Sequence, residues 1–197
     1  KGIKVYKAPS PGPLMMHNKI LVADTVSVSS RYHLDEIDFY KQTMFVNSVE
    51  NWPPEFALNY VGRYLKTELF SPVNTIGYYS HGSMTRKMAG HSNEGLRTEE
   101  AENRLMIDLK EYLRDKPHVH LTIFLHPREK SSGFYELAEK YYKDIFGDLP
   151  FTIAEKEIKA AFAFEMVDVG IVVLSAICYE RLFCGFKTLV APPSGNT

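Results

Sequence analysis

The chain has 197 residues, enough for one large domain, and its 45% hydrophobic and 13% aromatic content argues against a disordered protein. Its 23 Lys and Arg residues against 24 Asp and Glu residues leave a net charge of -1. That balance argues against a sequence-independent nucleic-acid binder, which would carry a basic excess. No apolar run is long enough to span a bilayer, and no signal-like segment opens the chain. Because the chain starts at Lys1 without a Met, we expect it to be a piece of a longer protein.

The first third of the chain, residues 1–70, shows no clean repeat of one supersecondary unit. Residues 19–27 predict a strand, and residues 60–70 predict a helix that carries Tyr60, Tyr64 and Leu65 on one side. The remainder is aromatic, acidic and only weakly periodic. We therefore interpret residues 1–70 as an irregular connecting segment or the remnant of a second domain.

A regular alternation of short apolar runs and helical stripes begins at Val73. Strands that alternate with helices predict an α/β fold with an open parallel, Rossmann-like sheet and right-handed crossovers over residues 71–197. The strands are expected at residues 75–79, 118–125, 151–153, 171–174 and 187–191.

The expected helices are delimited by capping residues and helix breakers. Thr98 is the expected N-cap of the first helix, Pro117 ends it, and Ser131 or Ser132 caps the second, which stops at Gly147. Further helices are predicted at residues 158–167 and 176–184, with a left-handed residue at Gly185 after the last one; residues 80–97 are predicted to be a long polar loop.

The two cysteines of the chain, Cys178 and Cys184, stand six residues apart in one predicted helix. Positions six apart lie on different faces of a helix, so a disulfide between them is not expected. We predict two buried thiols in a reducing compartment. Neither a zinc site nor any other metal site is expected, since ligand spacings and carboxylate clusters are missing.

Three polar segments follow predicted strand ends, where parallel sheets bind ligands. The first, SHGSMTRKMAGHS at residues 80–92, offers backbone N–H groups, hydroxyls, imidazoles and cations that suit a phosphate. It matches neither the P-loop nor the G-x-G-x-x-G pattern, and a solvated loop is the alternative. Its candidate residues are His81, Gly82, Ser83, Arg86 and Lys87.

The other two segments are LHPRE at residues 125–129 and the start of the helix after residue 174. Pro127 fixes the backbone so that the His126 imidazole points out from the strand end, although a lone histidine is more often an ordinary surface or core residue. Ser175 and its helix suit a phosphate, and the Glu180 carboxylate suits the two hydroxyls of a ribose. The alternative for Glu180 is an ion pair with Arg181 or a place on an exposed helix face.

The ordered set of strand, HP, helix, strand, then S-x4-E on a helix followed by G-x-K-T-L-V resembles the C-terminal nucleotide-binding half of GT-B glycosyltransferases. The HP element is most similar to bacterial sialyltransferases and to capsule or teichoic-acid polymer transferases that use CMP- or CDP-linked donors. The resemblance covers residues 73–193. It implies that His126 and Ser175 contact the donor phosphate, that Glu180 holds the ribose, and that His81 borders the reaction centre.

The sequence departs from that family in two ways. Residues 1–70 are too few for the second Rossmann-like domain of a complete GT-B enzyme. No acidic D/E-D/E-G element is present, and Asn93-Glu94-Gly95 matches it only in part and at a different place in the chain. The resemblance therefore does not identify the catalytic base. One interpretation is that this part of the protein binds the donor without catalysing its turnover.

We expect a transferase, or its donor-binding domain, that moves a sugar from a nucleotide-activated donor to a carbohydrate acceptor in surface-polysaccharide synthesis. The donor is a substrate, and no cofactor is expected. The resemblance implies a cytoplasmic location, with peripheral association of the full-length protein at the inner face of the membrane. Two alternatives stay open: a nucleotide-sugar epimerase or hydrolase on the same fold, and a non-catalytic flavodoxin-like interaction module.

Overall fold

A computed structural model gives the fold, and the chain divides into two compact units, Lys1–Tyr64 and Leu65–Thr197. The residues described are 6–7, 21–28, 44–51, 71–90, 96–173 and 175–191. The helix predicted at residues 60–70 lies outside them. Among the described residues, no helix combines the length and apolar character needed to cross a bilayer.

The first unit contains a parallel sheet in the order β1-β2-β3, formed by β1 (Tyr6–Lys7), β2 (Leu21–Val28) and β3 (Met44–Asn51). β2 matches the strand predicted at residues 19–27. The prediction of an otherwise irregular segment was wrong, because β3 is a full strand. Its sequence, MFVNSVEN, mixes apolar and polar residues without strict alternation, and Phe45 and Val49 are exposed.

The second unit contains a five-stranded sheet among its described residues, in the order β6-β5-β4-β7-β8, with every neighbouring pair parallel. The predicted parallel α/β sheet is confirmed. The strands are β4 (Thr75–Tyr79), β5 (His120–Phe124), β6 (Phe151–Ile153), β7 (Val169–Val172) and β8 (Thr188–Val190).

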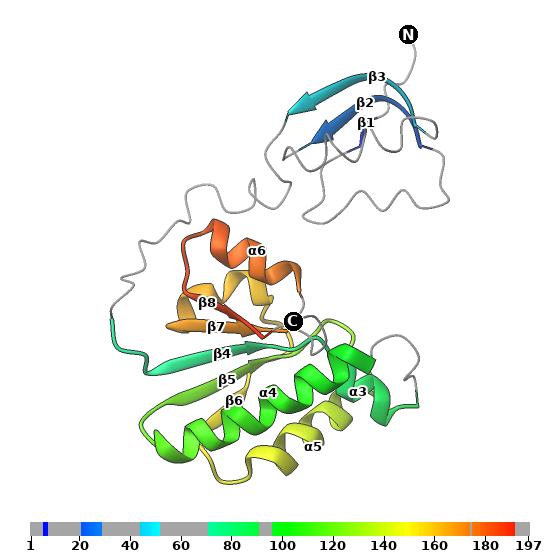
Figure 1. Cartoon of the computed structure of the whole chain (residues 1–197). Coiled ribbons are helices and arrows are strands. Elements are labelled where there is room, and N and C mark those ends of the chain that lie inside the picture. The colour runs from blue at the N-terminus through cyan, green and yellow to red at the C-terminus, as the bar shows by residue number, and fades with distance from the viewer. Residues whose placement is uncertain are drawn as a thin grey trace. The chain divides into compact units, whose positions relative to one another are not determined.

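Helices cover this sheet from both sides (Figure 1): α4 (Leu96–Asp115) and α5 (Tyr135–Phe146) on one, and α6 (Ala176–Phe183) on the other. The core lies between the sheet and the first pair. Tyr78 and Ile123 from the strands pack with Leu113 of α4 and Tyr142 of α5, all of them fully buried.

Several predicted boundaries were right. Helix α5 ends at Phe146, directly before Gly147, and α6 is followed by Gly185 at φ 78°, a left-handed conformation that glycine adopts without strain. The two cysteines are free and buried, as expected.

Other local predictions were wrong. The predicted polar loop contains a helix, α3 (Ser83–Met88), and α4 begins at Leu96, so Thr98 lies inside it rather than at its N-cap. Helix α5 begins after Phe134, which makes no side-chain capping bond, and the Ser131 hydroxyl donates to the Arg128 carbonyl instead of capping the helix. Residues 158–167 form two 3₁₀ turns, η2 (Ala160–Phe162) and η3 (Phe164–Met166), instead of one helix.

The strand order places a topological switch at the centre of the sheet. From β4 the chain moves through β5 to β6 on one side, and β7 and β8 lie on the other. Ligands of open α/β sheets bind outside the carboxyl ends of the strands at such a switch. Here that position lies beyond Tyr79 and Val172, the last residues of β4 and β7.

Candidate functional site

Two predicted segments meet at the carboxyl edge of the sheet. His81 follows β4 and His126 follows β5, and their imidazole ring centroids are 6.5 Å apart. Both side chains are half-buried. We call His81 and His126 the histidine pair.

The turn from β4 into α3 depends on Gly82, which has φ 74°. Other residues are strained in this left-handed conformation. The Gly82 amide donates to the Ser80 hydroxyl at 2.9 Å, and the chain then enters α3 at Ser83. Gly82 therefore shapes the backbone that carries His81.

Glu102 of α4 holds this turn from beneath, with a fully buried side chain. One carboxylate oxygen accepts hydrogen bonds from the Tyr78 hydroxyl and from the His81 amide at 3.2 Å. The other accepts from the amides of Ser83 at 2.9 Å and Met84 at 3.1 Å. Backbone amides at a helix start have no partner within the helix, and here a distant carboxylate provides one.

Glu129 does the same for the other histidine, and it too is buried. Its carboxylate accepts from the His126 amide at 2.8 Å and from the Thr85 hydroxyl of α3. Burial raises the pKa of Glu129 above its usual range, while these hydrogen bonds act in the opposite direction. Each backbone of the histidine pair is thus fixed by its own buried glutamate.

Cations surround the histidine pair. The Arg86 guanidinium donates to the Gly82 carbonyl at 3.3 Å and to the Ser83 hydroxyl at 3.4 Å. Burial lowers the pKa of both histidines below the usual 6.5, and the charges of Arg86 and Arg128 lower them further, against an opposing effect of Glu102. Such an environment favours an anion.

Lys87 and Pro127 each make a local contact that the sequence did not indicate. The Lys87 ammonium lies 3.4 Å from the buried carboxylate of Glu99, so it forms an ion pair with α4. Pro127 is the second residue of a turn in which the Glu129 amide donates to the His126 carbonyl at 2.8 Å. This is a favoured position for proline, and it directs the chain back under His126.

Ser175 follows β7, which flanks β4 on the side opposite β5, so it lies at the same edge of the sheet; Glu180 lies further along the helix that Ser175 begins. Ser175 is the N-cap of α6 and accepts a hydrogen bond from the Ile177 amide at 3.3 Å. Glu180 is half-buried on α6. The structure thus brings His81 and His126 into proximity and places Ser175 and Glu180 after the neighbouring strand.

Arg181, which the alternative reading of Glu180 made its ion-pair partner, is fully buried. Its guanidinium donates to the Tyr79 hydroxyl at 2.8 Å and to two backbone carbonyls, and it lies over the rings of Tyr79, Phe164 and Phe186. It therefore links α6 to the sheet.

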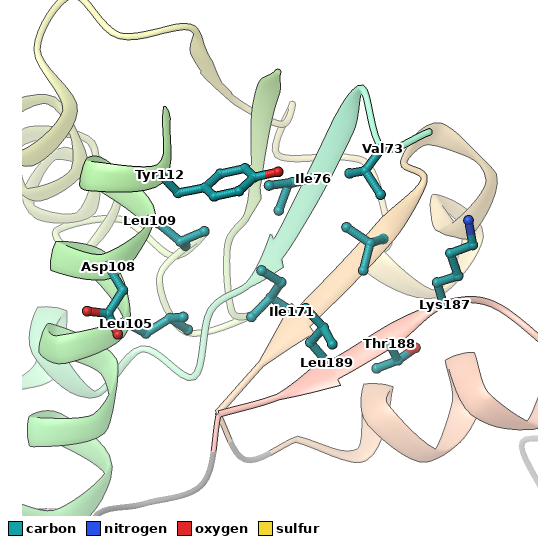
Figure 2. A pocket seen from close by; sticks show the side chains of 11 residues that line it. Val73, Ile76, Leu105, Asp108, Leu109, Tyr112, Ile171, Lys187, Thr188 and Leu189 are labelled. Carbon is teal, nitrogen blue, oxygen red and sulfur yellow. The ribbon is translucent and has the colours of Figure 1, made fainter. Parts of the chain in front are cut away.

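A groove of about 620 Å³ lies elsewhere on this unit, on the sheet face beside α4 (Figure 2). The nine predicted site residues are not among those that line it. The Asp108 carboxylate and the Lys187 ammonium point away from its apolar floor. Its lining residues are Val73, Ile76, Leu105, Asp108, Leu109, Tyr112, Val169, Ile171, Lys187, Thr188 and Leu189.

Within the described parts of the chain, no three His, Cys, Asp or Glu side chains are grouped to hold a metal ion. No protein-family model, curated protein or solved structure matches this chain.

Proposed function

We propose that the second unit binds the phosphate of a nucleotide-activated sugar beside the histidine pair, as the donor-binding domain of a GT-B-type glycosyltransferase in surface-polysaccharide synthesis. The observation that supports this most directly is the convergence of His81, His126 and Arg86 at the carboxyl edge, next to the topological switch. The acceptor is a carbohydrate, and the full-length protein works in the cytoplasm at the inner face of the membrane.

The geometry supports distinct roles for the two sides of the edge. On the β4–β5 side, the Arg86 charge neutralises the departing phosphate and His126 donates a hydrogen bond to it, the kind of electrostatic stabilisation that dominates many transfer reactions. On the β7 side, Ser175 lies near the phosphate and Glu180 accepts the ribose hydroxyls. A donor that lies across the carboxyl end of β4 would contact both sides.

Calorimetric titration with CMP, CDP, UDP, GDP and cytidine tests this function. We expect His126→Ala to weaken nucleotide binding by about 1.5–3 kcal/mol, the value of a hydrogen bond to a charged group, and to leave cytidine binding unchanged. Glu180→Gln should weaken nucleosides and nucleotides alike, since it alters a ribose contact.

His118→Ala is a matched control, because His118 is exposed just before β5 at the opposite end of the strand. It should bind like the parent. Absence of binding to any nucleotide by the parent, or equal affinity in all variants, would favour the non-catalytic interaction module.

A further inference from the structure

The histidine pair uses its ring nitrogens in opposite ways. His81 Nδ1 lies 2.6 Å from the Ser83 hydroxyl oxygen. That hydroxyl donates its single proton to Thr98 Oγ1 at 3.1 Å and accepts from Arg86 at 3.4 Å. Because the Ser83 proton is directed at Thr98, we assign His81 Nδ1 as the donor to the Ser83 oxygen. Neutral His81 therefore carries its proton on Nδ1, and its Nε2 has a free lone pair.

His126 has the opposite tautomer. Its Nδ1 accepts a hydrogen bond from the Arg128 amide at 3.1 Å. A backbone amide only donates, so this nitrogen carries no proton. Neutral His126 therefore has its proton on Nε2 and can donate from that atom.

The surroundings keep both rings neutral. Arg86, Arg128 and Glu102 act on each ring, and His81 acts in addition on His126. Burial and the two arginines lower the pKa of both rings, and Glu102 opposes them. At neutral pH the pair then offers one proton acceptor and one proton donor at a single site.

We propose that His81 Nε2 is the general base of the transfer reaction and that His126 Nε2–H is the hydrogen-bond donor to the leaving phosphate; this rests on the function proposed above. The acceptor hydroxyl gives its proton to His81 Nε2 as its oxygen bonds to the anomeric carbon. The bond from that carbon to the phosphate oxygen breaks, and its electron pair stays on the phosphate, which accepts from His126. His81 then releases the proton to solvent.

Nitrogen-detected NMR of the histidine-labelled chain at neutral pH tests the tautomers without any turnover. We expect the Nδ1–H form for His81 and the Nε2–H form for His126. Ser83→Ala removes the hydroxyl that accepts from His81 Nδ1, so it should shift His81 toward the Nε2–H form. Thr98→Val should do the same, because the Ser83 proton can then be donated to His81 Nδ1. Ser132→Ala, at an exposed position, is the control. A parent His81 in the Nε2–H form would overturn the proposal.

Hydrolysis of a CMP-linked sugar, measured beside CMP binding, tests the roles. His81→Gln should lose about 10²- to 10⁴-fold in rate, the usual value of general-base catalysis, and far less in CMP affinity. His126→Gln should bind CMP more tightly than His126→Ala, because its amide can replace the Nε2–H donor. A parent that binds CMP but shows no turnover, or a His81→Gln variant with the parental rate, overturns the base assignment. A parent that binds no nucleotide contradicts the proposed function itself.

Discussion

The carboxyl edge and the apolar groove belong to the same unit and share strands β4 and β7, yet they differ in how they treat charged groups. At the edge, two carboxylates are buried, and each is surrounded by amide and hydroxyl donors. In the groove, the floor is aliphatic and the charged groups point outward. The apolar groove is therefore not where the polar chemistry lies.

The difference follows from the cost of burial. An ionised carboxylate without partners is very costly to bury, so Glu102 is tolerable only because the turn after β4 supplies its donors. Parallel sheets normally have both faces covered, yet Leu189 in the groove is 57% exposed. The edge is thus a preorganised polar site, whereas the groove is an uncovered part of the sheet face.

Removing the carboxylate that organises the edge should have the largest effect. Glu102→Ala leaves the Tyr78 hydroxyl and the amides of His81 and Ser83 without an acceptor. We expect a loss of about 3–5 kcal/mol in the free energy of unfolding, measured by urea denaturation. Glu111→Ala, at an exposed position of the same helix, should stay within about 0.5 kcal/mol of the parent. Similar stabilities for the two variants would show that Glu102 does not hold the edge.

A smaller effect is expected from pH. The pKa values of His81 and His126 are lowered in the folded state, so the unfolded chain binds their protons more tightly. Stability should therefore be complete above the unfolded value of about 6.5 and fall as pH decreases from there toward the folded-state values. In urea denaturation, the double variant His81→Gln/His126→Gln should lose less stability than the parent over this window. A parallel pH dependence in the two proteins would contradict the lowered pKa values.

The sheet was predictable because its signals are local. The runs around Ile76, Ile123 and Ile171 are short and apolar, helical stripes separate them, and parallel strands buried on both faces require that pattern. The approach of His81 to His126 followed from the same pattern, since adjacent parallel strands end at one edge.

The partner that fixes His81 was not predictable, because it acts across a long sequence separation, whereas Glu129 is only three residues from His126. Glu102 is 21 residues from His81, and its only local signal is a glutamate next to the apolar stripe of α4. Helix α3 has six residues, too few for a periodic signal.

The burial of Arg181 was not predicted, because it depends on a glycine in another element. A Cβ at Gly170 would lie 2.3 Å from Arg181 Nε, so only a glycine in β7 leaves room for the guanidinium. Nothing in the sequence around Arg181 indicates that space.

The smallest effect on stability is expected in the groove. Leu189→Glu places a carboxylate at a position that is already more than half exposed, so the free energy of unfolding should change by no more than about 0.5 kcal/mol. The same change should abolish binding of an anionic apolar dye such as anilinonaphthalene sulfonate, because the new charge repels the sulfonate and must be desolvated when the dye enters. Met166→Glu, at a residue 53% exposed outside the groove, is the matched control and should keep the dye response.

An unchanged response in Leu189→Glu would show that the dye binds elsewhere. A loss of several kcal/mol in the free energy of unfolding would mean that Leu189 is covered in solution. The contrast between a preorganised polar edge and an uncovered groove would then no longer hold.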